Sequence, residues 1–133
     1  MEADLAQTAR AFADPIARAP SPAGETPIDL VHLARQTFGE RDLEAELLRL
    51  FDRQSAQILA RLAEPGPVDG RWRADLAHTL KGSARAVGAF GVAAAAETYE
   101  DCARAEGDVA ACLGGLSKAV AAAHGAIGDL LAG

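Results

Sequence analysis

One stretch of the sequence, residues 75–89, combines an imidazole, two cations and two glycines at helical spacing. At about 100° per residue, one line along the predicted helix is apolar. It comprises Trp72, Leu76, Leu80, Ser83 and Val87. Because His78 points almost directly away from that line, we expect its ring to lie in solvent.

The predicted outward face around His78 carries small and cationic residues: Ala74, Lys81, Gly82 and Arg85. Lys81 and Arg85 follow one and two turns later, where they would hold an anion near the ring. A glycine inside a helix costs about 1 kcal/mol relative to alanine, so Gly82 indicates the close approach of another backbone. The pattern predicts a histidine that accepts a phosphoryl group from a docking protein.

The run 78–84, followed by Gly88 and Glu100, resembles the signature of histidine-containing phosphotransfer (HPt) domains of bacterial multistep phosphorelays. The similarity extends more weakly over residues 27–131. It implies that phospho-His78 relays a phosphoryl group between the aspartyl phosphates of receiver domains, from a hybrid sensor histidine kinase to a response regulator. It also implies a phosphocarrier without kinase activity, for which the partner receiver supplies catalysis and Mg²⁺.

The expected antiparallel return of the next helix makes Glu100 the best acceptor for a proton on His78 Nδ1, although a solvated glutamate stays an open alternative. In the resembled family, a polar or acidic residue 22 positions after the histidine often has this role, which fits Glu100. Lys81 would neutralise phosphoryl oxygens as a point charge. Arg85 would do the same, pair with an acidic rim on the partner, or be a plain surface charge. Ser83 is expected on the core side, bonded to its own helix.

Other functions receive less support from the residues. There is no glycine-rich phosphate loop and no acidic cluster for magnesium, so ATP binding is not expected. A metal site is an alternative because Asp29 with His32, and Asp75 with His78, have i,i+3 spacing in a helical chain. Two further alternatives are a receiver-docking module that is not phosphorylated and the substrate segment of a chemotaxis-type kinase.

The chain contains two cysteines and two further histidines that could in principle do chemistry. Cys102 and Cys112 lack a CxxC spacing and are read as small apolar residues in a reducing compartment. His32 and His124 have no cations at the spacing found around His78, so a structural or merely solvated role is expected for both.

The composition favours an all-α protein. Hydrophobic residues make up 50% of the 133 residues, aromatic residues only 5%, and alanine supplies much of the apolar content. A net charge of -6 argues against nucleic acid as a partner. Uninterrupted apolar runs are far shorter than a membrane span, and the first residues lack signal-peptide features. We therefore expect a cytoplasmic protein without membrane contact, and a monomer.

The predicted architecture is an up-down antiparallel four-helix bundle with a short N-terminal lid helix. The expected helices cover 28–38 (the lid), 42–63, 68–87, a segment between Gly88 and Gly107, and a segment from Asp108 to the C-terminal end. Prolines at 20, 22 and 27 indicate a linker. We assign residues 1–26 to a tail that is partly helical or unstructured and 27–133 to the bundle domain.

Overall fold

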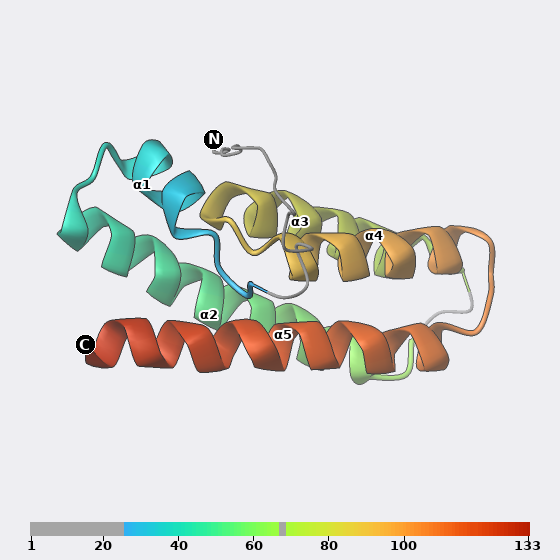
Figure 1. Ribbon diagram of the computed structural model, residues 1–133. Coiled ribbons are helices and arrows are strands. Elements are labelled where there is room, and N and C mark those ends of the chain that lie inside the picture. Colours follow the sequence, from blue (N-terminus) through green and yellow to red (C-terminus); the bar gives the residue numbers. More distant parts are fainter. Residues whose placement is uncertain (1–25, 67–68) are drawn as a thin grey trace.

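A computed structural model describes residues 26–66 and 69–133. Within these ranges the chain forms five helices and no strand (Figure 1). They are α1 (Leu30–Thr37), α2 (Arg41–Ala63), α3 (Arg71–Val87), α4 (Phe90–Arg104) and α5 (Val109–Ala132). The prediction of an all-α bundle with a short N-terminal helix is confirmed. The predicted tail over 1–26 lies almost entirely outside the described residues, and the boundary at residue 27 stays a prediction.

The four long helices run up and down beside one another. Helix α3 packs most extensively on α4, while α5 closes the bundle against α4 and α2, and α2 contacts α3. Helix α1 lies across one end, against α2 and α3 (Figure 1). A helix of eight residues is too short to be stable alone, so α1 depends on these contacts.

The core is built largely from small side chains. Ala74, Ala77 and Ala84 of α3 are fully buried, opposite alanines of α4 such as Ala96 and Ala103. The side chains of Trp72, Leu76 and Ser83 are only partly buried, so the predicted apolar line of α3 is rotated relative to the actual buried face. The prediction gave weight to large residues, whereas burial follows the alanines because they allow α3 and α4 to approach closely.

Gly88 joins α3 to α4 and also contacts the entry to α1. Its φ of 83° is a left-handed conformation that ends α3. The backbone N–H of Asp29 donates to Gly88 O at 2.8 Å. A Cβ on Gly88 would lie 2.7 Å from Asp29 O, so the close approach of the two segments requires glycine. Asp29 then caps α1 by accepting from the His32 N–H.

Helix α2 has a polar residue in its buried face. Leu48, Phe51, Ile58 and Leu62 are buried, whereas Leu43 and Leu50 are exposed. Ser55 is fully buried among the apolar residues. Its hydroxyl is satisfied by the backbone oxygen of Phe51 at 2.6 Å, which allows a polar residue in the core.

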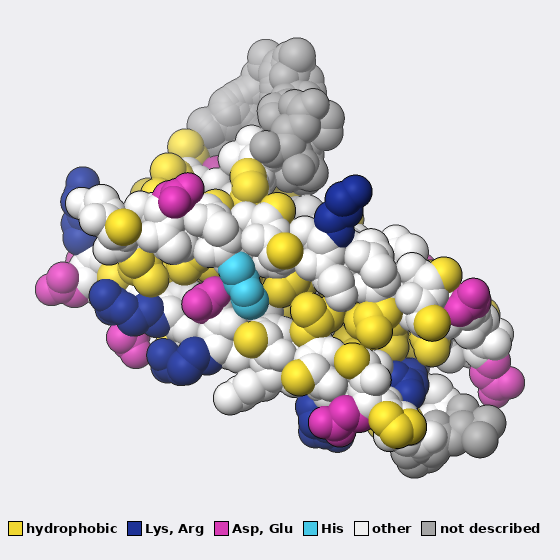
Figure 2. Space-filling model, turned by 90° about the horizontal axis from the view of Figure 1, so that it is seen from below, with side chains coloured by type: hydrophobic (Ala, Val, Ile, Leu, Met, Phe, Trp, Pro, Cys, Tyr) yellow, Lys and Arg dark blue, Asp and Glu magenta, His cyan; other side chains and the backbone are white. Residues whose placement is uncertain are grey.

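Helix α5 is long and apolar enough to cross a membrane by length and composition alone, which the short apolar runs did not indicate. In this fold Leu116, Val120, Ala123 and Ile127 of α5 are buried in the bundle. Figure 2 shows the molecule from the side of α5 in Figure 1, where small apolar side chains are interspersed with charged ones. Such scattered apolar residues are normal on a protein surface, so α5 is explained as a bundle helix.

Candidate functional site

His78 projects from the middle of α3 with 64% of its side chain exposed. Its neighbour Ala77 is fully buried, and so is Ala74 one turn earlier. The expected exposure of the ring is therefore present even though the buried face of α3 is rotated. Ala74, which we expected beside His78 on the docking face, is fully buried, so it is not available for contact with a partner.

Glu100 of α4 lies directly against the His78 ring. His78 Nδ1 is 3.1 Å from Glu100 Oε2 and 3.4 Å from Oε1. The Glu100 side chain is only 8% exposed. The expected proximity of the two residues is thus present, and the open alternative of a solvated glutamate is not.

Two cations share the same carboxylate. Lys81 Nζ is 3.0 Å from Glu100 Oε1. Arg104 donates to Oε2 through Nη2 at 2.9 Å and through Nε at 3.2 Å. Its guanidinium also lies 3.9 Å from Asp75 Oδ1 of α3. We call His78, Lys81, Glu100 and Arg104 the Glu100 network.

The Glu100 network keeps its carboxylate ionised. Burial raises the pKa of Glu100, but hydrogen bonds from Arg104 and Lys81, the charge of Lys81 and the contact with His78 outweigh it. The resulting pKa is about 2. Because an ionised carboxylate only accepts hydrogen bonds, His78 Nδ1 must carry the proton in this contact. The lone pair of a neutral ring is then on Nε2.

Nothing in the described part of the chain hydrogen-bonds to His78 Nε2. Together with the exposure of the ring, this leaves the nucleophilic nitrogen open to a second molecule. The arrangement can therefore donate a ring lone pair to an electrophile while Nδ1 stays hydrogen-bonded.

Lys81 and Ser83 differ from their predicted settings. The Lys81 side chain is 13% exposed and is bound to Glu100, so it is not a free surface cation. The reason is the rotation of α3, which turns Lys81 toward α4. Ser83 is partly buried, but its hydroxyl makes no hydrogen bond within the described residues, so the expected bond to its own helix is absent.

Gly82 and Arg85 lie on the exposed face as expected. A Cβ on Gly82 would meet no atom within 4 Å, so the backbone there is bare. The Arg85 side chain is 55% exposed, with Nη2 3.8 Å from Glu97 Oε1. This pair spans α3 and α4 beside the Glu100 network.

Arg104 is the functional candidate that the sequence analysis missed, because it lies outside the histidine motif, 26 positions after His78. It is half exposed, yet its donors reach inward to Glu100. The available signal was the i,i+4 spacing of Glu100 and Arg104, which places the two side chains together on a helix. A long arginine can cover a half-buried acid while its own backbone faces solvent.

The other reactive residues do not join this site. His32 lies edge-on to Phe90, with ring centroids 5.0 Å apart. His124 contacts Ser55 and Asp52 on the other side of the bundle. Both cysteines are free thiols. Among the described residues, no group of three or more histidine, cysteine or acidic side chains is placed to hold a metal ion.

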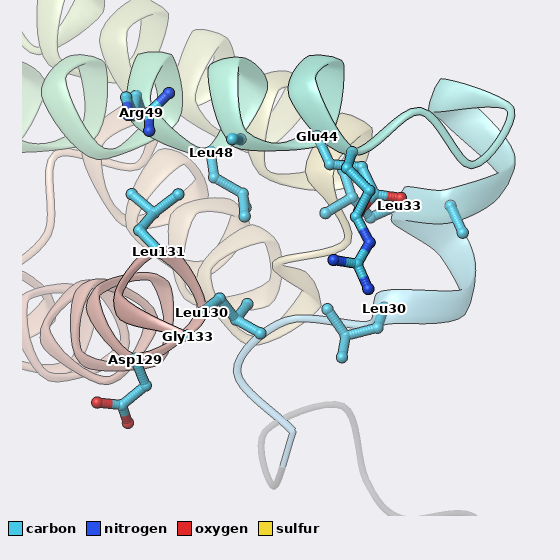
Figure 3. Close-up of a pocket in the computed structure, with 12 residues that line it drawn as sticks. Leu30, Leu33, Glu44, Leu48, Arg49, Asp129, Leu130, Leu131 and Gly133 are labelled. Carbon is cyan, nitrogen blue, oxygen red and sulfur yellow. The ribbon is translucent and has the colours of Figure 1, made fainter.

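A separate cavity of about 630 Å³ lies between α1, the start of α2 and the end of α5 (Figure 3). Its walls include Leu30, Leu48 and Leu131, with Arg49 and Asp129 at the edges. No member of the Glu100 network lines it. The cavity therefore takes no part in the chemistry available at His78.

The comparisons with known proteins agree with this geometry. The family model described as the Hpt domain matches residues 46–131, well over half of the chain. No curated protein and no solved structure gives a significant match. The matched range contains all of α3 and α4, and with them His78 and Glu100. The chain therefore belongs to the Hpt domain family.

Proposed function

We propose that this protein relays a phosphoryl group through His78, from the aspartyl phosphate of one receiver domain to the aspartate of another. Membership of the Hpt family supports a phosphotransfer role in phosphorelays. The observation that carries the assignment to His78 is the exposed ring, with Nδ1 held by Glu100 and Nε2 left open.

The transfer step follows from these contacts. The Nε2 lone pair forms a bond to phosphorus, and the bond from phosphorus to the aspartyl oxygen breaks with its electron pair returning to that carboxylate. Positive charge develops on the ring, and the Glu100 carboxylate stabilises it through the proton on Nδ1. Transfer to the next receiver reverses these bonds.

The partners and the setting follow from the same proposal. Response regulator receivers and a hybrid sensor histidine kinase are the expected partners, and the receiver supplies the Mg²⁺ that this chain has no described cluster to hold. The exposed backbone at Gly82 and the charge of Arg85 would border the docking face. We further propose that the protein is a cytoplasmic monomer with no catalytic activity of its own.

The test is label transfer. The protein is incubated with a phosphorylated receiver from its own organism, and acid-labile, base-stable label on His78 is expected. H78Q should carry no label. Binding of the receiver without labelling would favour the docking module that is not phosphorylated, and label that survives H78Q would refute the assigned acceptor.

A further inference from the structure

We propose that Arg104 is a positioning residue that holds Glu100 in line with His78, and thereby frees Lys81 to bind the incoming phosphoryl group. This inference rests on the proposed function and extends it to a residue outside the histidine motif. Arg104 belongs to α4, 26 positions after His78, and it does not contact the ring itself.

The two oxygens of Glu100 have different donors. Oε2 accepts hydrogen bonds from Nε and Nη2 of Arg104, and it is also the oxygen closer to His78 Nδ1. Oε1 lies 3.0 Å from Lys81 Nζ. Arg104 therefore fixes the oxygen that faces the ring, and Lys81 holds the other one.

This division matters when a phosphoryl group arrives. A phosphoryl group on Nε2 brings negative charge to the exposed side of the ring, and Lys81 is the nearest cation on the same helix, three residues along. If Lys81 turned to that group, a carboxylate that is 8% exposed would lose one of its two cations. A buried charge left without a partner is strongly unfavourable. Arg104 removes this obstacle because its two hydrogen bonds remain on Oε2.

The same contacts determine which ring nitrogen is nucleophilic. Glu100 accepts a hydrogen bond from the proton on Nδ1, which leaves the lone pair of a neutral ring on Nε2. If Oε2 moved away from Nδ1, the ring would lose this preference, and a proton on Nε2 would block attack. By holding Oε2 in place with two hydrogen bonds, Arg104 favours the reactive tautomer. Arg49 of α2 provides a control, since it forms an exposed pair with Glu46 and does not contact Glu100.

The experiment compares the full chain with its R104Q, R104K and R49Q variants. Long-range ¹⁵N–¹H spectra at about pH 8, where a histidine is mostly neutral, report which nitrogen of His78 carries the proton. Labelling by phosphoramidate, a small donor that needs no receiver, gives the rate at His78. In R104Q we expect proton density to move toward Nε2 and labelling to slow about tenfold. R104K keeps the charge but not the two-point contact and should show a smaller shift, whereas R49Q should match the wild type.

The release of Lys81 is tested by adding K81Q. If Lys81 stays on Glu100 when Arg104 is absent, K81Q slows labelling less in the R104Q background than in the wild type. Additive effects would refute that part of the proposal. An unchanged tautomer and rate in R104Q would overturn the positioning role. If R104Q does not fold by circular dichroism, the tautomer in R104K decides the question.

The outcome is separable from that of the proposed function. Should no receiver label the wild type, the relay assignment fails, yet the tautomer spectra still establish or refute the role of Arg104. Should receivers label R104Q at the wild-type rate with an unchanged tautomer, the relay stands and Arg104 is only a surface cation.

Discussion

Among the described residues, two histidines pair with carboxylates, and of these His78 alone has a mostly exposed side chain. On the α3–α4 side, His78 contacts Glu100 through Nδ1 and its side chain is 64% exposed. On the α2–α5 side, His124 Nε2 lies 2.7 Å from Ser55 Oγ and 3.3 Å from Asp52 Oδ1, and its side chain is 30% exposed. The Ser55 hydroxyl proton is directed to backbone oxygen, so Nε2 of His124 must be the donor in that contact.

The two pairs differ in which ring nitrogen is bound and in the charges around it. At His78 the acid binds the nitrogen nearer the backbone and the outer nitrogen is accessible, with Lys81 and Arg104 on the same acid. At His124 the outer nitrogen itself binds two helices together, and none of its described contacts is to a cation. A carboxylate next to a histidine is therefore not sufficient to predict a phosphoryl acceptor. The ring nitrogen that the carboxylate binds and the charges around the pair must also be known.

The strongest test of this comparison exchanges each histidine for glutamine. H78Q should abolish labelling by a phosphorylated receiver and leave stability nearly unchanged, since its ring is exposed. H124Q should keep labelling but lower the free energy of unfolding by about 1–2 kcal/mol, because the side-chain contact of α5 with Ser55 and Asp52 of α2 is lost. Radiolabel transfer and urea unfolding measure the two effects, and loss of labelling in H124Q would invalidate the contrast.

Removing the acid of the reactive pair should have the next largest effect. We expect E100Q to slow phosphotransfer about tenfold and to reduce the free energy of unfolding by about 1–3 kcal/mol, because Lys81 and Arg104 lose a common partner. E97Q is the control, since Glu97 forms only an exposed pair with Arg85 and should change stability by less than about 0.5 kcal/mol. Stopped-flow transfer assays and urea unfolding distinguish the variants, and equal behaviour of the two would contradict the role of Glu100.

Bulk on the docking face should slow transfer without harming the fold. In G82Q the new side chain meets open space, so we expect about fivefold slower transfer and about 0.5 kcal/mol more stability from better helix propensity. Gly114 of α5 is equally open, and G114Q should gain similar stability with unchanged transfer. If both variants transfer phosphate at the wild-type rate, the face around Gly82 is not the interface.

The smallest expected effect is on acid stability. The folded pKa of Glu100 is about 2, below its ordinary value of 4.5, so its stabilising contribution is complete above pH 4.5 and is lost as the pH falls toward 2. E100Q should therefore lose less of its remaining stability than the wild type across this interval. Urea unfolding at several pH values provides the measurement, and parallel curves would show that the Glu100 network does not contribute.

Much of the fold was accessible from sequence because its signals are local. Gly88 and Gly107, together with the cap at Asp108, bracket α4 and α5 closely. The periodicity also predicted that His78 would be exposed. The same periodicity placed Ala74 on the exposed face of the helix, because the pattern was defined by large apolar residues. In the structure Ala74 is completely buried.

The sequence alone predicted the element order, the exposure of His78 and its proximity to Glu100, since helical phase and a short α3–α4 turn constrain both sides of that contact. Only the tertiary structure decided that Lys81 lies on Glu100 and that Arg104 completes the network. Those contacts depend on the rotation of α3 against α4 and on the reach of long side chains. Both are set by close packing between helices, and periodicity along one helix does not specify either.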